Sequence, residues 1–418
     1  MSNTTANAYG LWWRKPAVIV TIGCLVALTG FGIRSTFGLF LEPMTLANGW
    51  GRETFALAMA IQNLFWGIGV PVAGAIADRR GAAPVLVVGS IAYCAGIYGM
   101  AMAESATLLY LFGGVLIGLG IAFTGFAIAL SAIAKVVGPD KRSLALGLGT
   151  AAGSLGQVIF SPISQSFISF YGWHSALLIL AGLALLIIPM ATLIPQRTEA
   201  IGEAMSDQTL SDALREAIAH RGYLLLTSGF FVCGFHVAFI TVHFPAYVTD
   251  LGFSGSVGAI SLALIGLFNI AGSFGSGAIG QRKSKKTSLS WIYLLRAAAI
   301  TGLMVFPKTE WTIYIFAACM GLLWLSTVPL TTGIVGQVFG LRYLATLFGI
   351  VFFSHQVGSF LGVWLGGYLF DITGTYDAVW WVGVALGLLA ALVHMPIDER
   401  PLARLSQPLD QASAHGGS

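Results

Sequence analysis

Apolar residues recur along this chain in long continuous runs that only short polar segments interrupt. Each run has about the 20 residues that an α-helix needs to cross the hydrocarbon of a bilayer. A membrane β-barrel would instead show short segments of alternating polarity. The pattern predicts an all-α integral membrane protein, with twelve transmembrane helices near residues 17–41, 54–77, 83–102, 107–134, 144–169, 174–195, 222–249, 257–280, 287–306, 311–336, 344–369 and 376–396.

Composition agrees with this pattern. Of the 418 residues, 56% are hydrophobic and 9% are charged, whereas soluble domains carry about 25% charged residues. The 53 glycines suit helices in lipid, because small residues let helix backbones approach closely. A water-soluble fold is excluded.

Loop charges predict the orientation, because Lys and Arg are retained on the cytoplasmic side. With the amino terminus inside, 17 of the 21 basic residues fall in the cytoplasm; Arg52 and Lys308 fall outside, and Arg34 and Arg296 lie within spans. We expect a multi-pass protein of the plasma (inner) membrane with both termini cytoplasmic. The net charge of +4 follows from this asymmetry and from the anionic inner leaflet, and does not support nucleic-acid binding.

The two halves of the sequence match at an offset of about 202 residues. Gly32 and Arg34 in the first span correspond to Gly234 and His236 in the seventh, each 202 residues apart. The repeat predicts two pseudosymmetric six-helix bundles.

A long polar segment separates the halves. Four of its apolar residues are spaced as one face of a short surface helix, namely Leu210, Leu214, Ala217 and Ile218. We interpret this helix as a linker, with recruitment of a partner as the alternative. The tail is rich in Ser, Gln and Gly, and we expect it to be disordered. The expected domains are an N-terminal bundle over 1–196, a cytoplasmic linker over 197–220, a C-terminal bundle over 221–400 and the tail over 401–418.

This organisation resembles the major facilitator superfamily across nearly the whole chain. After the second span, Gly74, Asp78, Arg79 and Gly81 match the Gly-x-x-x-Asp-Arg-x-Gly loop of that family. The loop ties helices 2 and 11 together in the outward-facing state, so the resemblance implies the major facilitator fold and a gating role for these residues. The second copy, residues 277–284, lacks the acidic residue and the last glycine, and we expect a weaker latch there.

Within the superfamily the chain is most similar to the monocarboxylate transporters, particularly the bacterial ones. The similarity lies in residues 34–40, at the end of the first span, and in residues 239–252, after the seventh. This resemblance implies proton-linked transport of a small carboxylate. The family usually has an Asp and an Arg in helix 8, where this chain has Asn269 and Ser273, so the chain departs from the family at the residues of its usual coupling mechanism.

Arg34 is the main candidate for substrate binding. It lies about 17 residues into the first span, roughly 25 Å from the cytoplasmic end, whereas all 17 acidic residues lie in loops or near helix ends. A buried guanidinium offers a planar fork that suits a carboxylate, so a substrate anion is its natural counter-ion. The alternative is that Arg34 reaches the interface or bonds helix carbonyls.

Histidines supply the candidates for proton coupling, because imidazole changes charge near neutral pH. His236 and His355 fall at about half depth, and the resemblance implies that helix 7 lines the central cavity and helix 11 flanks it. Both are candidates for substrate binding and for proton coupling; a neutral histidine bonded inside the bundle is the alternative. His243, two turns beyond His236, is a candidate gate or an interfacial residue.

Neutral side chains complete the candidate site. Asn63, Gln157 and Asn269 could fix a small polar solute without adding charge, with Gln62 as a weaker candidate. We expect Arg296, in peripheral helix 9, to bind helix carbonyls.

The function that follows is secondary active transport of a small organic anion, expected to be a monocarboxylate, by proton-coupled rocker-switch alternating access. No Walker sequence, spaced metal ligands or nucleophile elbow is present in the sequence, so we expect no enzyme activity, cofactor or metal. We expect a monomer in the lipid bilayer, with the carboxylate and a proton as its partners. The alternatives are an efflux carrier for drugs or amphipathic compounds, an anion exchanger and a solute-sensing receptor.

Overall fold

The structure is a computed structural model that describes residues 16–125, 128–129, 139–194, 208–340 and 342–406, with the backbone alone for Asp78, residues 139–146 and Ser406. Every regular element in these ranges is helical. In the first half these are α1 (Pro16–Ser35), η3 (Phe37–Phe40), α2 (Leu41–Asn48), α3 (Arg52–Arg80), α4 (Ala82–Ala101), α5 (Ala106–Leu109), η4 (Tyr110–Leu116), α6 (Ile117–Thr124), α8 (Pro139–Ala184) and α9 (Ile187–Thr192). From the linker onward they are α10 (Leu210–Ala219), α11 (Arg221–Asp250), α12 (Gly255–Arg282), α13 (Lys285–Val305), α14 (Glu310–Leu323), α15 (Thr327–Phe339), α16 (Leu344–Thr373), α17 (Asp377–His394) and α18 (Ala403–Ser406).

The described helices account for the twelve predicted crossings. Eleven segments are long and apolar enough to span a membrane, and one of them, Gly147–Thr192, has 46 residues. A straight helix of that length would measure about 69 Å, more than twice the hydrocarbon thickness of about 30 Å. The helix is broken at Gly172, whose φ of +78° is not helical. Because the chain turns there, this segment makes two crossings, and the predicted all-α membrane fold is confirmed.

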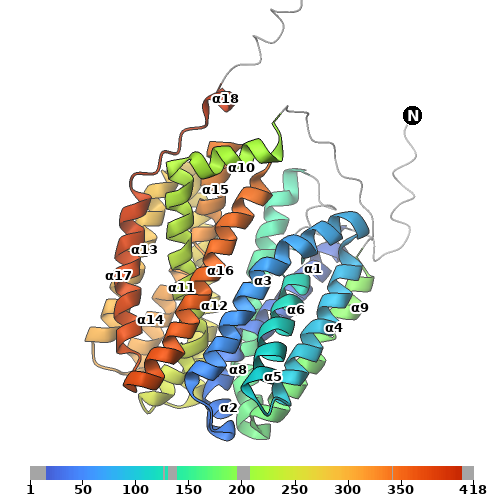
Figure 1. The fold of residues 1–418 in the computed structure, drawn as a ribbon, viewed down its shortest axis with the longest axis vertical. Coiled ribbons are helices and arrows are strands. Elements are labelled where there is room, and N and C mark those ends of the chain that lie inside the picture. The colour runs from blue at the N-terminus through green and yellow to red at the C-terminus, as the bar shows by residue number, and fades with distance from the viewer. Residues whose placement is uncertain (1–15, 126–127, 130–138, 195–207, 341, 407–418) are drawn as a thin grey trace, which may run out of the picture.

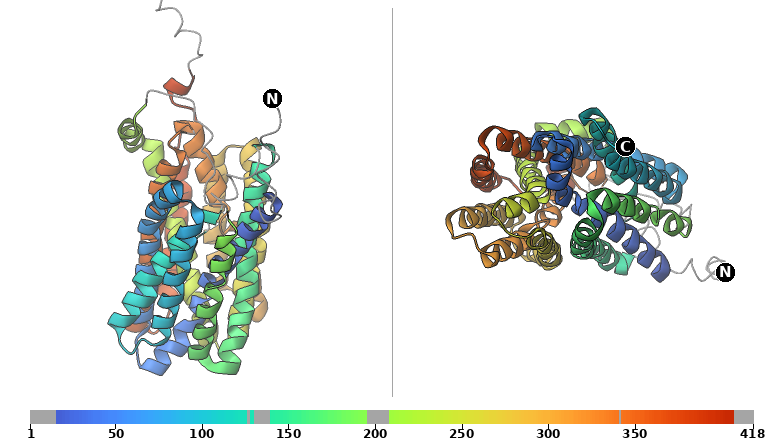
Figure 2. Two further views of the ribbon diagram at one scale, coloured as in Figure 1. Left: turned by 90° about the vertical axis from the view of Figure 1, so that its right-hand side faces the viewer. Right: turned by 90° about the horizontal axis from the view of Figure 1, so that it is seen from below.

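The two halves of the chain form two bundles that lie side by side. Figure 1 shows the blue-to-green helices of the first half on one side and the yellow-to-red helices of the second half on the other, and the view from below in Figure 2 shows the same separation. The most extensive contacts between the bundles are those of α3 with α16 and of α8 with α12, and η3 and α2 also contact α11. In Figure 1, α3 and α16 lie side by side in the lower part and separate toward the top.

The linker helix α10 lies across the upper end of the second bundle in Figure 1. We name this the linker end and the opposite one the far end. The predicted apolar face of α10 is only partly correct: Ala217 is buried, whereas Leu210 and Ile218 are exposed. The buried face is centred on Ala213 and Ala217, because small side chains let α10 approach α11 closely.

The start of the segment expected to be disordered is ordered. Residues 403–406 form α18, and Arg404 pairs with Glu216 of α10 at 2.9 Å. Arg404 also donates to the carbonyl oxygen of Phe339 at 2.8 Å. These contacts fix residues 401–406 against the linker helix, and the rest of the expected tail, 407–418, lies outside the described residues.

Candidate functional site

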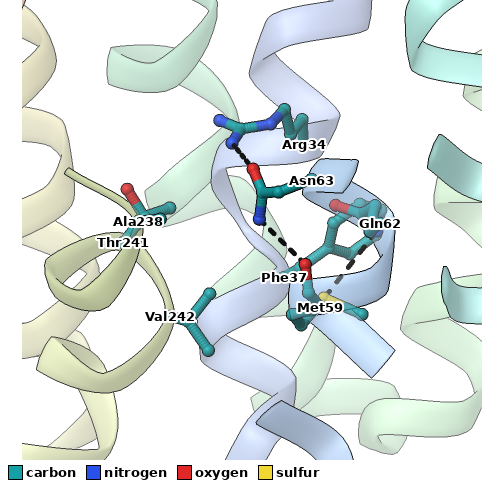
Figure 3. Close-up of a pocket in the computed structure, with 8 residues that line it drawn as sticks. All are labelled: Arg34, Phe37, Met59, Gln62, Asn63, Ala238, Thr241 and Val242. Carbon is teal, nitrogen blue, oxygen red and sulfur yellow. Dashed lines mark hydrogen bonds between the residues drawn. The ribbon is translucent and has the colours of Figure 1, made fainter. Parts of the chain in front are cut away.

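A pocket between the two bundles contains the predicted arginine. Helices α1 and α3 and the η3 turn supply one wall and α11 supplies the other, as Figure 3 shows. Its cavity volume is ≈ 10 Å³, about the room that a single water molecule needs, so the pocket is nearly closed in this state. The residues that line it are Arg34, Phe37, Met59, Gln62, Asn63, Ala238, Thr241 and Val242.

Arg34 is held in this pocket by neutral groups. Its Nη2 donates to Oδ1 of Asn63 at 3.0 Å, and the Asn63 amide in turn donates to the carbonyl oxygen of Met59 at 2.8 Å. The guanidinium carbon lies 4.4 Å from the ring centre of Trp66, within cation–π range. Arg34 is only 8% exposed, and its Nε has no hydrogen-bond partner. In the described part of the chain no ion pair involves Arg34, so the site carries an uncompensated positive charge.

Aromatic rings connect Arg34 to His355 across the bundle interface. Trp66 of α3 meets Phe352 of α16 edge to face, with ring centres 5.5 Å apart. Phe352 is stacked on His355 at 5.7 Å, and His355 Nδ1 lies 3.1 Å from Oε1 of Gln356. His355 therefore lies near the interface, separated from Arg34 by two rings.

His236 does not line the pocket. Its Nε2 bonds the carbonyl oxygen of Gly383 on α17 at 2.7 Å, and its Nδ1 has no partner. The ring is buried among α11, α17 and α13, so the structure does not bring Arg34 and His236 to one cavity as the repeat suggested. The 202-residue offset aligns the positions along the helices, but helix packing decides which way each side chain points.

Gln157 and Asn269 also lie away from the pocket. Gln157 of α8 donates to the carbonyl oxygen of Leu262 at 2.8 Å, and Asn269 of α12 donates to Ser154 Oγ at 2.9 Å. Both bonds cross between the bundles. The side-chain amides of Gln157 and Asn269 thus bond the facing helix at the α8–α12 contact.

The far end of the molecule is closed by a polar cluster. Arg52 at the start of α3 forms an ion pair with Asp250 at 2.6 Å, and its Nη1 donates to the Tyr376 hydroxyl at 2.9 Å. The Asp371 carboxylate accepts from the backbone N–H groups of Arg52 and Glu53 at 2.9 and 2.8 Å. Each of these bonds joins the first bundle to the second.

His243, the predicted gate residue, lies directly behind this cluster. Its Nδ1 is 3.1 Å from the Tyr376 hydroxyl, and its Nε2 is 2.7 Å from the carbonyl oxygen of Val363. The side chain is fully buried. It therefore braces the tyrosine that bonds Arg52.

At the linker end, the predicted latch loop joins α3 to α4. Gly81 has a φ of +89°, which favours glycine, and Arg79 is exposed. No atom outside the helix lies within 4 Å of where a Cβ on Gly74 would be. The side chain of Asp78 lies outside the described residues. The bundle contacts that close the far end are thus not repeated beside Gly74.

Sequence reasoning missed part of the pocket wall. The sequence singles out Gln62 as a weaker candidate but does not single out Phe37, Met59, Ala238, Thr241 and Val242. The available signal was spacing: Ala238, Thr241 and Val242 are three and four residues apart on α11, and so share one helix face. Their apolar or weakly polar character made them look like ordinary packing residues.

Comparison with known proteins agrees with this architecture. The Major Facilitator Superfamily model matches residues 22–362. Monocarboxylate transporter 13 of Rattus norvegicus is 26% identical over 380 residues, covering 87% of this chain and 86% of the relative. The uncharacterized MFS-type transporter YcxA of Bacillus subtilis (strain 168) is 24% identical over 387 residues, covering 89% and 92%.

Solved structures share the fold at low sequence identity. The crystal structure of a D-xylose–proton symporter aligns with a TM-score of 0.72 at 13% identity, covering 92% of this chain and 98% of that one. A bacterial homologue of the human lysosomal transporter Spinster, inward-facing and occupied, aligns with a TM-score of 0.69 at 16% identity, covering 90% and 96%. The two-bundle membrane fold and the family match across most of the sequence lead to one conclusion: this chain belongs to the major facilitator superfamily and is a membrane transporter with monocarboxylate transporters among its relatives.

Proposed function

We propose that this transporter carries a small organic anion, a monocarboxylate, which binds at Arg34. The observation that carries the proposal is a guanidinium in a pocket between the bundles, bonded to a neutral amide, with no ion-pair partner among the described residues. A buried charge without a partner is costly. An anionic substrate supplies the missing partner, and the names of the relatives agree with a carboxylate.

The residues around Arg34 have complementary roles in this proposal. Asn63 orients the guanidinium, and Trp66 lies against its face. Gln62 and Thr241 add polar atoms on opposite walls of the pocket. Phe37 and Val242 supply apolar surface for the hydrocarbon part of the solute. A short carboxylate with an apolar tail matches these polar and apolar walls in chemistry, and the pocket must widen from ≈ 10 Å³ to admit it.

For proton coupling we propose His355 in preference to His236. The rings of Trp66 and Phe352 connect the Arg34 site to His355, whereas His236 is directed toward Gly383. A proton on His355 would offset part of the charge that the anion brings into the low-dielectric interior.

Transport then follows an alternating-access cycle in which the bundles rock about the pocket. We propose that the linker end faces the cytoplasm, as the loop charges predict, so that this state is closed to the outside. The Arg52 cluster, braced by His243, closes the outer side. The Gly74–Gly81 loop closes the inner side in the opposite state, when α3 and α16 approach each other there.

The test is anion binding and uptake by purified protein in proteoliposomes. A panel of short mono- and dicarboxylates is screened by thermal shift across pH, and the anions that stabilise the protein are then used for uptake. We expect Arg34→Gln to remove the stabilisation and uptake, because charge-assisted hydrogen bonds contribute about 1.5–3 kcal/mol, roughly 10- to 100-fold in affinity.

Arg34→Lys is the matched control. It keeps the charge but loses the planar fork, so we expect intermediate affinity. Uptake by Arg34→Gln at the wild-type rate would refute the site, and no response of the wild type to any anion would refute the substrate class.

A further inference from the structure

The tenth span is interrupted. Helix α14 ends at Leu323 and α15 begins at Thr327, so residues 324–326 separate them. A break of this kind leaves backbone N–H and C=O groups without helical partners, and in a membrane-embedded bundle other groups must satisfy them. Two side chains from other helices of the second bundle do so here.

Arg296 of α13 satisfies the carbonyl side of the break. Its Nε and Nη2 donate to the carbonyl oxygen of Leu323 at 3.1 and 2.7 Å, and Nη2 also donates to that of Trp324. The side chain is fully buried. It therefore places a cation at the C-terminal end of α14, where the helix dipole is negative.

Asn269 of α12 satisfies the amide side of the break and also reaches the other bundle. Its Oδ1 accepts from the backbone N–H of Leu325 at 3.0 Å, and its Nδ2 donates to Ser154 Oγ at 2.9 Å. Ser154 lies on α8, and its hydroxyl faces the carbonyl oxygen of Thr150 at 3.4 Å. One amide side chain thus joins the break to the bundle interface.

We propose that the break at 324–326 is a hinge, that Arg296 and Asn269 are positioning residues which set its geometry, and that Asn269 couples the hinge to the bundle interface through Ser154. Rocking of the bundles displaces α8 relative to α12. That displacement alters the bond from Asn269 to Ser154, whereas the bond from Ser273 Oγ to Asn269 Oδ1 at 3.1 Å stays within α12. The amide therefore shifts, and with it the acceptor available to the Leu325 N–H. The hinge therefore responds to the state of the interface.

This proposal goes beyond the anion site, because it holds for any solute that the carrier moves. A purely structural role would satisfy the break without any influence from the first bundle. Substitution of Ser154 distinguishes the two roles, because Ser154 belongs to the first bundle and makes no bond to residues 324–326 in the described part of the chain.

The test is hydrogen–deuterium exchange of full-length protein in nanodiscs, followed on peptides that cover residues 324–328. We expect Asn269→Ala to raise the exchange rate about tenfold, since one lost hydrogen bond is worth about that much in an opening equilibrium. Ser154→Ala should raise it about threefold. Ser261→Ala is the matched control, because Ser261 lies on α12 with Asn269 and, among the described residues, its hydroxyl bonds the Val257 carbonyl oxygen of its own helix. Exchange should not change in this variant.

The exchange rates of these variants test the hinge and its coupling to the bundle interface separately. Unchanged exchange in Asn269→Ala would overturn the hinge, and a rise in Asn269→Ala without one in Ser154→Ala would overturn the coupling. Arg296→Lys keeps the charge but loses the planar fork, so it should raise exchange less than Arg296→Met, which should exceed tenfold; equal exchange in wild type and Arg296→Met would overturn the role of Arg296. If the Met variant fails to fold, the Asn269 and Ser154 variants still decide.

A transport measurement adds an independent readout. With any solute that the wild-type protein carries, Asn269→Ala and Ser154→Ala should lower the maximal rate and leave KM within about twofold, and the double variant should be no slower than the slower single variant. If the losses of maximal rate in the two single variants add in the double variant, Ser154 and Asn269 act independently, and the proposed coupling is contradicted. Because the exchange measurement needs no substrate, failure of the anion proposal leaves it intact.

Discussion

Arg52 and Asp250 join the two bundles at the far end through two parallel hydrogen bonds of 2.6 Å each, Nη1 to Oδ2 and Nη2 to Oδ1. The Arg52 guanidinium also lies 3.8 Å from the ring centre of Phe370. The two side chains are only 12% and 31% exposed. A bidentate, partly shielded pair of this kind is stronger than the exposed pairs that contribute about 0–1 kcal/mol.

Breaking this pair should open the far end. In Arg52→Gln and in Asp250→Asn we expect a Thr241→Cys reporter in the pocket to react several-fold faster with a membrane-impermeant thiol reagent added from the far side. The double variant should match the single ones, because each removes the same interaction. Protein without the reporter corrects for the four native cysteines. Equal labelling in all variants would show that the pair does not hold this end closed.

Placing a carboxylate beside Arg34 should abolish anion binding. Asn63→Asp is nearly isosteric and sets an acidic group about where Oδ1 now lies, 3.0 Å from Arg34 Nη2. The internal ion pair then occupies the guanidinium, so thermal stability should be kept while stabilisation by carboxylates is lost. Asn63→Ala leaves the guanidinium unpaired and should weaken binding about tenfold, by roughly one hydrogen bond. Carboxylate binding by Asn63→Asp at wild-type affinity would argue against Arg34 as the anion site.

The two candidate coupling histidines, His236 and His355, should differ in their effect on proton coupling. We expect His355→Gln to remove the stimulation of uptake by an inward proton gradient while exchange of anion for anion continues. His236→Gln should keep the stimulation, because His236 bonds Gly383 and does not line the pocket. The measurement is uptake with and without an imposed pH gradient. The opposite assignment would follow if only the His236 variant lost the stimulation.

Close contact between α11 and α16 should make two glycines sensitive to substitution. A Cβ on Gly234 would overlap the carbonyl oxygen of His355, and one on Gly358 would overlap that of Phe231. Because these are backbone atoms, Gly234→Ala and Gly358→Ala should each destabilise the protein by about 1–3 kcal/mol, seen as a lower melting temperature. Gly349→Ala, also on α16, meets no atom within 4 Å and should change stability by under about 0.5 kcal/mol. Three equal melting curves would contradict this packing.

Much of the fold could be predicted from the sequence because the bilayer imposes simple rules. A span needs about 20 apolar residues with internally satisfied backbone, so run length alone located the crossings, including the two that meet at Gly172. The same rules single out Arg34 and Arg296, since ionisable residues at membrane depth are rare. Run length does not reveal that the tenth span breaks at 324–326, because Glu310–Phe339 is one continuous apolar span.

The sequence by itself determined the all-helical membrane fold, the candidate arginine and the possibility of carboxylate chemistry. Only the tertiary structure decided which side chains share a pocket: it placed Asn63 on Arg34 and Thr241 opposite, and turned His236 toward α17. The physical reason is that hydrophobicity reports depth along a helix, whereas direction around the helix axis is set by packing. In lipid that packing depends on close backbone contacts rather than on burial of apolar surface, and the hydropathy pattern carries little record of it.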